Sequence, residues 1–308
     1  MPQKVTFQSH GLALKGELYL PSDSSGKKRA AIVVGHPFGG VKEQTAGLYA
    51  KHLSSLGFIA LTFDAGYQGE SEGEPRYLED PSARSEDFKS AVSYLTTLDQ
   101  VDPERIGALG ICAAGGYVPF TAQTERRIKA VATISAADIG QLYREGLGGT
   151  QSPDDLKKNL EEAGKERTKE ARGAAPRLEH IVPNTVEDAA KAAPPRTLFR
   201  EGTDYYRTSR AQHPNSQNWY VFRSLDQLAS FSAFDYVDLI SPHPLLLIAG
   251  TDADTLYFSE TAYKKAKEPK ELFLIDGATH IDLYDKEQYV GPAVKKLDSF
   301  FTQYLSGN

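Results

Sequence analysis

Gly107-Ala-Leu-Gly-Ile-Cys-Ala-Ala-Gly-Gly116 is the segment from which we predict the fold of this chain. Residues 106–110 have the short apolar pattern of a buried strand, and residues 112–123 have the pattern of a helix that follows it directly. Small residues suit the junction because the turn is tight and the helix packs closely on the strand. The pattern therefore places Cys112 on a sharp turn between a strand and a helix.

This turn has the spacing of a nucleophile elbow, G-x-S-x-G, with two departures. Cys112 replaces the serine, and Ala114 stands where the last glycine usually is. A helix N-terminus favours negative charge, so we expect a lowered thiol pKa and a reactive thiolate. The alternative to a reactive role is that Cys112 is a buried cysteine that only contributes to packing. The spacing excludes the dinucleotide motif G-x-G-x-x-G and the phosphate loop G-K-[ST].

Strands and helices alternate on both sides of this turn, after an apparent hairpin over residues 4–20. This alternation predicts an α/β fold with a mostly parallel central sheet and helices on both faces. The expected strands are residues 30–34, 58–63, 106–110, 128–134, 244–248 and 271–275, and the expected helices are residues 44–56, 82–98, 112–123, 259–267 and 290–305.

The alternation stops between the two halves of the chain. Residues 152–170 have a charged helical pattern, residues 171–195 are rich in Ala and Pro, and aromatic side chains crowd the part that follows. A length of 308 residues suits one catalytic domain with a large insertion. We expect residues 1–137 and 241–308 to form the core. Residues 138–240 are then a mainly helical cap over the C-terminal edge of the sheet, where ligands bind in such folds.

Three further segments follow strand ends: Gly35-His-Pro-Phe-Gly-Gly-Val-Lys-Glu-Gln44, Gly250-Thr-Asp-Ala-Asp-Thr255 and Gly277-Ala-Thr-His-Ile-Asp-Leu-Tyr284. Together with the cysteine turn, they resemble the α/β-hydrolase superfamily. The cysteine is similar to that of dienelactone hydrolases, which use Cys, His and Asp. The full sequences of these segments resemble those of uncharacterised bacterial hydrolases and fungal polyketide-transferase-like enzymes of secondary metabolism.

The resemblance implies roles for particular residues. His280 follows the last strand and is the expected base, since nucleophile, acid and histidine come in the order of that superfamily. Asp254 is the first choice for the acid that orients the imidazole, and Asp252 is the second, because the usual spacing falls between them.

The remaining expected roles concern the oxyanion hole and the acyl pocket. Backbone N–H groups of Ala113 and of Phe38 or Gly39 are the expected oxyanion hole. His36 is expected only to hold its loop by hydrogen bonds, and Asp64 to brace the turn after its strand. The aromatics of the insertion either pack in a core or line an apolar acyl pocket, with Tyr205, Tyr206 and Trp219 as candidates.

The amino-acid composition restricts which partners and cofactors we expect for this chain. Asp and Glu outnumber Lys and Arg by 41 to 35, and no basic patch stands out, so nucleic acid is not an expected partner. The single cysteine allows no intrachain disulfide, and no histidines pair at metal-ligand spacing, so we expect neither a metal nor another cofactor. Without a signal-peptide pattern or a bilayer-spanning apolar run, we expect a cytoplasmic protein that does not bind membranes. A homodimer is left open.

These features predict an enzyme that hydrolyses an ester, lactone or thioester of an apolar acyl group through a Cys-His-Asp triad and a covalent acyl-enzyme. The first alternative is an acyltransferase that moves a polyketide acyl group from a carrier thioester to an alcohol. The second is a non-catalytic binding protein with the hydrolase fold. In each case the expected partner is a small acyl compound, free or carrier-bound.

Overall fold

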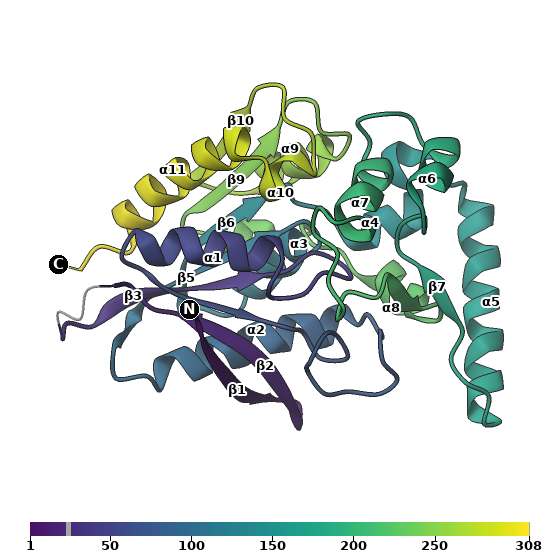
Figure 1. Ribbon diagram of the computed structural model, residues 1–308, viewed down its shortest axis with the longest axis horizontal. Helices are drawn as coiled ribbons and strands as arrows, with labels where there is room; N and C mark the ends of the chain where they lie inside the picture. Colours follow the sequence, from purple (N-terminus) through teal and green to yellow (C-terminus); the bar gives the residue numbers. More distant parts are fainter. Residues whose placement is uncertain (23–25, 308) are drawn as a thin grey trace.

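The computed structural model describes residues 1–22 and 26–307, and an eight-stranded sheet forms its centre (Figure 1). The strand order is β1-β2-β4-β3-β5-β6-β9-β10. In chain order these strands are β1 (Gln3–Ser9), β2 (Leu12–Tyr19), β3 (Arg29–Gly35), β4 (Ile59–Phe63), β5 (Val101–Ile111), β6 (Ile128–Ile134), β9 (Leu245–Gly250) and β10 (Lys270–Ile275).

The sheet is parallel from β4 to β10, and only the N-terminal hairpin β1–β2 is antiparallel to its neighbours. Parallel strands need helical crossovers, and these cover both faces. Helices α1 and α11 pack together, while α2, α3 and α9 form a second group with the short helix η2. These elements are α1 (Thr45–Ser55), α2 (Pro81–Thr96), α3 (Ala114–Ala122), α9 (Leu256–Lys265), α10 (Asp282–Asp285), α11 (Glu287–Tyr304) and η2 (Val237–Ile240).

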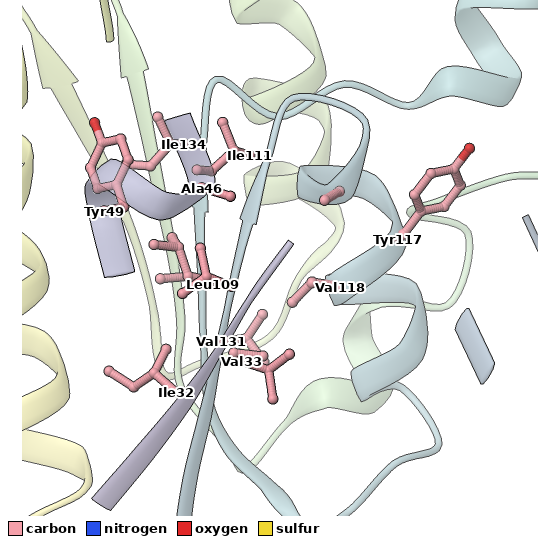
Figure 2. Close-up of a cluster of buried hydrophobic side chains, with 14 of the residues drawn as sticks. Ile32, Val33, Ala46, Tyr49, Leu109, Ile111, Tyr117, Val118, Val131 and Ile134 are labelled. Carbon is pink, nitrogen blue, oxygen red and sulfur yellow. The ribbon is translucent and has the colours of Figure 1, made fainter. Parts of the chain in front are cut away.

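Apolar strands account for the core. Every residue of β4 and β9 is buried, and so are all but the first residue of β3. Figure 2 shows Ile32 and Val33 of β3 beside Leu109 of β5, with Tyr49 of α1 and Tyr117 of α3 on opposite sides. Burial of each such aliphatic side chain stabilises the fold by roughly 1.5–3 kcal/mol. The strands that position the site therefore form a rigid frame.

Between β6 and β9 the chain adds no strand to the large sheet. This insertion gathers at the end of the molecule away from both termini (Figure 1). The mainly helical cap and the α/β class are confirmed. The insertion contains α4 (Ile139–Glu145), η1 (Leu147–Gly149), α5 (Pro153–Ala171), β7 (Leu178–His180), α6 (Val186–Ala192), α7 (Leu198–Arg207), β8 (Trp219–Val221) and α8 (Ser224–Ser230).

The antiparallel pair β7–β8 inside the cap was not expected from the sequence, since each strand is too short to show a period. Among residues 1–22 and 26–307, no helix has both the length and the apolar character needed to cross a bilayer.

Candidate functional site

Cys112 occupies a strained turn between β5 and α3. Its φ is 56°, a left-handed conformation that costs free energy for a residue with a side chain. The turn is held from β6, because the Cys112 N–H donates to the Ile134 carbonyl at 3.0 Å and the Ala137 N–H donates to the Cys112 carbonyl at 3.0 Å. A Cβ at Gly110 would collide with the Ala114 carbonyl, so the tight packing of α3 on β5 requires glycine there.

Two backbone donors converge on the sulfur. The N–H groups of Phe38 and Ala113 both hydrogen bond the Cys112 thiol. Gly39, the other candidate donor in the loop of residues 35–40, binds the cap through its carbonyl, which accepts from the Ser216 hydroxyl at 2.7 Å. The structure therefore brings together Phe38 and Ala113, the two N–H groups that the sequence placed in an oxyanion hole, at the Cys112 sulfur.

His280 lies on the loop between β10 and α10 and is completely buried. Its Nδ1 lies 2.5 Å from the Thr255 hydroxyl, and its Nε2 lies 3.2 Å from the Tyr284 hydroxyl. Tyr284 in turn hydrogen bonds the Cys112 thiol. The Ser135 hydroxyl donates to the His280 carbonyl at 2.9 Å and fixes the loop to the end of β6. Within the described chain, the thiol and the imidazole are thus joined through Tyr284 and share no direct hydrogen bond.

Neither aspartate makes the contact with His280 that we expected. Asp254 accepts the backbone N–H of Leu198, at the start of α7, at 2.9 Å. Asp252 forms a half-exposed ion pair with Arg196 at 2.7 Å. Both carboxylates therefore bind the cap. The turn after β9 points successive side chains in different directions, and the residue that it aims at the imidazole is a threonine.

The loop of residues 35–40 is anchored to α2 by a buried arginine. Arg84 donates to the His36 carbonyl at 3.1 Å and lies 3.0 Å from the His36 ring nitrogen Nε2. The other ring nitrogen lies 2.7 Å from the Pro37 carbonyl, so the expected structural role of His36 is confirmed. The Arg84 charge is balanced by buried Glu79, whose carboxylate also accepts from the Tyr117 hydroxyl at 2.8 Å.

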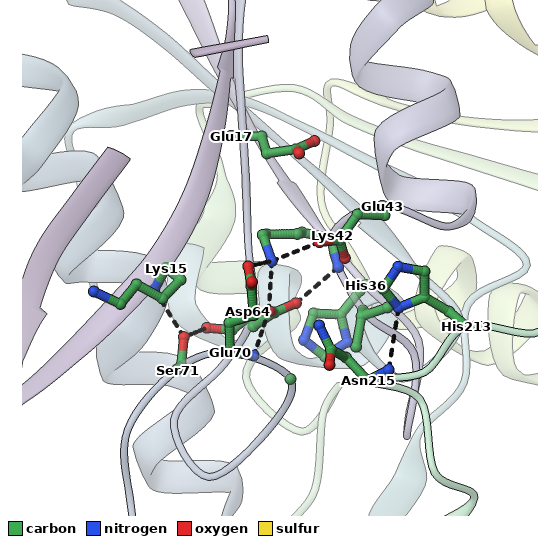
Figure 3. A network of polar contacts seen from close by, with 12 residues as sticks. Lys15, Glu17, His36, Lys42, Glu43, Asp64, Glu70, Ser71, His213 and Asn215 are labelled. Carbon is green, nitrogen blue, oxygen red and sulfur yellow. Dashed lines mark hydrogen bonds and ion pairs between the residues drawn. The ribbon is translucent and has the colours of Figure 1, made fainter. Parts of the chain in front are cut away.

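A second network holds the turn after β4 (Figure 3). Buried Asp64 accepts from the Glu70 N–H at 2.8 Å and pairs with the Lys42 amine at 2.8 Å. The same amine lies 2.7 Å from both Glu43 and Glu70. The expected bracing role of Asp64 is confirmed. Burial raises the pKa of Asp64, and the Lys42 charge opposes that shift.

Cys112 opens on a cavity of about 550 Å³ between the sheet and the cap. Of the three aromatic residues that we expected in an acyl pocket, only Tyr206 lines it. Tyr205 packs edge-on against Tyr206, with ring centres 4.8 Å apart, and Trp219 stacks on His180 at 3.9 Å. Most of the wall is apolar or aromatic: Pro37, Phe38, Ile139, Leu142, Tyr143, Leu147, Ile181, Val182, Leu198, Phe199, Tyr206, Tyr220, Ile281 and Tyr284.

Comparison with known proteins identifies the family. The dienelactone hydrolase family model matches residues 14–136. The uncharacterised protein YcjY of Escherichia coli strain K12 is 38% identical over 310 residues, which cover 99% of this chain and 100% of YcjY. This chain belongs to the dienelactone hydrolase family of α/β hydrolases. The crystal structure of the hypothetical protein PA2218 from Pseudomonas aeruginosa matches this α/β hydrolase with a TM-score of 0.91 and 36% identity, covering 99% of this chain and 94% of PA2218.

A fungal relative of this α/β hydrolase has a functional name. Polyketide transferase claH of Penicillium crustosum is 25% identical over 299 residues, which cover 94% of this chain and 93% of claH. The match therefore spans both the core and the inserted cap of this chain.

Burial sets the charge state of this α/β hydrolase's candidate site. It raises the pKa of the Cys112 thiol, although the hydrogen bonds that Tyr284, Ala113 and Phe38 donate to the thiolate form act in the opposite direction. It also lowers the pKa of His280 to about 3. The resting pair is therefore a neutral thiol and a neutral imidazole. This corrects the expectation of a lowered thiol pKa, because desolvation outweighs the helix N-terminus here.

Sequence reasoning missed three residues of the site: Thr255, Tyr284 and Arg84. Tyr284 comes one helical turn after His280, a spacing that puts two side chains on the same face of a helix. Thr255 directly follows Asp254, but nothing in the sequence distinguishes the two as partners of His280. Arg84 carries no motif. Within the described ranges, no group of three or more His, Cys, Asp or Glu side chains could hold a metal ion.

Proposed function

We propose that this protein hydrolyses an ester, lactone or thioester of an apolar carboxylic acid through an acyl-enzyme on Cys112. One observation carries the proposal. Cys112 lies on a positive-φ turn at the wall of an apolar cavity of about 550 Å³, with the N–H groups of Phe38 and Ala113 directed at its sulfur. Hydrolysis also agrees with membership of the dienelactone hydrolase family.

The proposed reaction begins when the sulfur attacks the acyl carbon and the thiol proton passes to His280. Electrons of the carbonyl double bond move to its oxygen, where the N–H groups of Phe38 and Ala113 stabilise the negative charge. Donors of this kind stabilise the transition state by about 3–4 kcal/mol each in comparable enzymes. The intermediate collapses, the leaving group takes a proton back, and water then cleaves the Cys112 thioester by the same steps.

The nucleophile and the cavity restrict the substrate class. A thiolate leaves a tetrahedral intermediate more readily than an alkoxide does, so a cysteine suits activated acyl groups such as esters, lactones and thioesters better than amides. The apolar wall formed by the cap, including Leu142, Ile181 and Phe199, fits an acyl chain without charge.

Acyl transfer to an alcohol is the second candidate. It is supported by the similarity along the whole chain to a fungal protein named as a polyketide transferase. The two reactions share the acyl-enzyme on Cys112 and differ only in whether water or an alcohol attacks it. The ratio of free acid to new ester, measured with added alcohols, separates them.

The test is mass spectrometry of the protein after brief exposure to a panel of apolar thioesters and esters. We expect a mass increase by one acyl group on Cys112 and its loss on further incubation. Because Cys112 is the only cysteine, a modified cysteine can be assigned without ambiguity. The Cys112→Ala variant should form no adduct and should lose at least about 1000-fold in turnover.

A folded Cys112→Ala variant that keeps full turnover on every substrate cleaved by the wild type would contradict the nucleophile assignment. Absence of any adduct with the whole panel, together with turnover of none of its members, would instead favour the non-catalytic binding protein. Circular dichroism and thermal unfolding establish that the variant is folded.

A further inference from the structure

The side chain of His280 lies behind the wall of the cavity rather than on it. Its side chain is completely buried and is absent from the residues that line the cavity, whereas Cys112 and Tyr284 both line it. Tyr284 lines the open space and also contacts the imidazole, with ring centres of His280 and Tyr284 5.6 Å apart. Tyr284 therefore offers a path for a proton between a reacting group in the cavity and His280.

The hydroxyl of Tyr284 touches both ends of that path. It lies 3.2 Å from His280 Nε2, and it hydrogen bonds the Cys112 thiol. One arrangement of protons satisfies all the groups: Nδ1–H donates to the Thr255 hydroxyl, Tyr284 donates to Nε2, and the thiol donates to the Tyr284 oxygen. This is a continuous line of hydrogen bonds from the sulfur to the base.

Tyr284 is held in this position by α1. The Tyr49 hydroxyl donates to the Leu283 carbonyl at 2.7 Å, and the Thr45 hydroxyl donates to the Tyr284 carbonyl at 3.1 Å. Tyr205 packs edge-on against the Tyr284 ring, with centres 5.1 Å apart. The short helix α10 is thus fixed at its backbone and at its ring, so the hydroxyl keeps both contacts.

We propose that Tyr284 is a catalytic proton relay between Cys112 and His280. This inference rests on the proposed function and deepens it by naming a residue that touches the reacting sulfur. When the sulfur attacks, the S–H bond breaks and its proton moves to the Tyr284 oxygen, while the Tyr284 proton moves to Nε2. Tyr284 ends as a neutral phenol, and His280 becomes the imidazolium.

The same relay runs backward when the leaving group departs. The bond from the acyl carbon to the leaving group breaks, and its electron pair takes a proton from Tyr284, which is replaced by the Nε2 proton of His280. A water molecule that attacks the acyl-enzyme gives up its proton along the same path. Atoms and charges balance in each half-reaction, and no further reactant is needed.

The experiment compares Tyr284→Phe with Tyr289→Phe. Both changes remove one phenolic hydroxyl from the same part of the fold. Tyr289 donates to the Gly277 carbonyl at 3.3 Å, on the loop that carries His280, and does not line the cavity. Rapid-quench mass spectrometry measures acylation of Cys112 by the thioester S-hexanoyl-N-acetylcysteamine between pH 6 and pH 10.

We expect acylation by the Tyr284→Phe protein to be about 100-fold slower at pH 7, as for loss of a proton-transfer group. The deficit should shrink as pH rises, because hydroxide then removes the thiol proton without the relay. The substrate concentration at half-maximal rate should stay unchanged. Tyr289→Phe should stay within about twofold of wild type, since it leaves the relay intact.

Two results separate failure of the relay from failure of the proposed function. If wild-type Cys112 is acylated and Tyr284→Phe matches it in rate and pH profile, the relay is overturned while the function stands. If no thioester acylates wild-type Cys112, the proposed function is contradicted. The contact between Tyr284 and the Cys112 thiol is then tested separately, by the rate of alkylation of Cys112 with iodoacetamide. A pH profile of alkylation that is the same in both proteins then overturns the assignment, and a profile moved to higher pH in Tyr284→Phe supports it.

Discussion

Thr255 stands beside His280 where a carboxylate was expected, and this side chain changes the acid–base chemistry of the site. Its hydroxyl lies 2.5 Å from Nδ1 and fixes the ring, but it adds no negative charge to stabilise an imidazolium. A thiol loses its proton more easily than an alcohol does, since the ordinary pKa of a cysteine thiol is about 8.5. A weak base with a neutral partner is therefore compatible with Cys112 in a way that it would not be with serine.

Thr255→Val should lower kcat by about 10-fold to 100-fold and leave KM unchanged. The change keeps the shape of the side chain but leaves Nδ1 of a buried imidazole without a hydrogen-bond partner. An unpaired buried group of this kind costs roughly 1–3 kcal/mol of free energy. Steady-state kinetics on the best substrate of the thioester panel measures this split between kcat and KM.

Ser259→Ala is the matched control, since it removes a hydroxyl from α9, the helix that begins directly after Thr255. The Ser259 hydroxyl is buried and has no hydrogen-bond partner in the described parts of the chain, so its loss should leave both constants within about twofold. An equal fall in kcat for the two variants would mean that α9 is merely sensitive to substitution and that Thr255 has no positioning role.

At the scale of elements, α7 connects the core to the cavity wall. It supplies Leu198, Phe199 and Tyr206 to the wall, and its first turn lacks a side-chain cap of its own. The Asp254 carboxylate, from the loop after β9, accepts the Leu198 N–H and so replaces that cap from another part of the chain. The position of α7, and with it the shape of the cavity, depends on this contact.

Asp254→Asn tests that interpretation against a triad acid. Asparagine keeps the acceptor for Leu198, so a capping role predicts kcat and KM within about threefold of wild type. In a serine protease, the same change to the acid that orients the histidine lowers kcat by about 10⁴-fold. A loss of that size would assign the triad acid to Asp254 after all.

Asp254→Ala, which removes the acceptor, should raise KM several-fold with little change in kcat. The loss of a helix cap weakens the start of α7 by about 1 kcal/mol, and the acyl chain then binds to a less ordered wall. Michaelis–Menten kinetics on both Asp254 variants provides the comparison.

For the whole molecule, buried His280 makes stability depend on pH. Its pKa falls from the ordinary 6.5 to about 3 on folding, so between these values the unfolded chain binds more protons than the folded one. Stability is then full above about pH 6.5 and is lost as pH falls through that window. The loss from this group between pH 7 and pH 5 is about 2 kcal/mol.

Urea unfolding at these two pH values, for wild type and His280→Gln, measures the effect. The variant should lose about 2 kcal/mol less than wild type on acidification, because it has no proton to gain at this position. His36, whose pKa burial also lowers, contributes equally to both proteins. Equal losses in the two proteins would show that His280 is not the group that takes up the proton.

Local patterns along the chain were enough to predict the architecture and the position of the candidate nucleophile. Alternating apolar runs and helical patterns are local properties, and they predicted the parallel sheet, the helices on its faces and the inserted cap. The glycines around Cys112 encode a tight strand-to-helix turn, so residue 112 could be assigned before any contact was known. The strand ends also placed Phe38, Ala113 and His280 near that turn, as the structure has them.

Which side chains touch depends on the packing of segments that are distant in the sequence. Whether Asp254 or Thr255 faces His280 depends on the direction of adjacent side chains in one turn, and no period in the sequence encodes that direction. The pKa of Cys112 depends on how deeply the cap buries it, and the placement of Tyr284 between sulfur and imidazole depends on contacts from α1. The cysteine is fixed by local pattern, and its chemistry is fixed by distant segments packed against it.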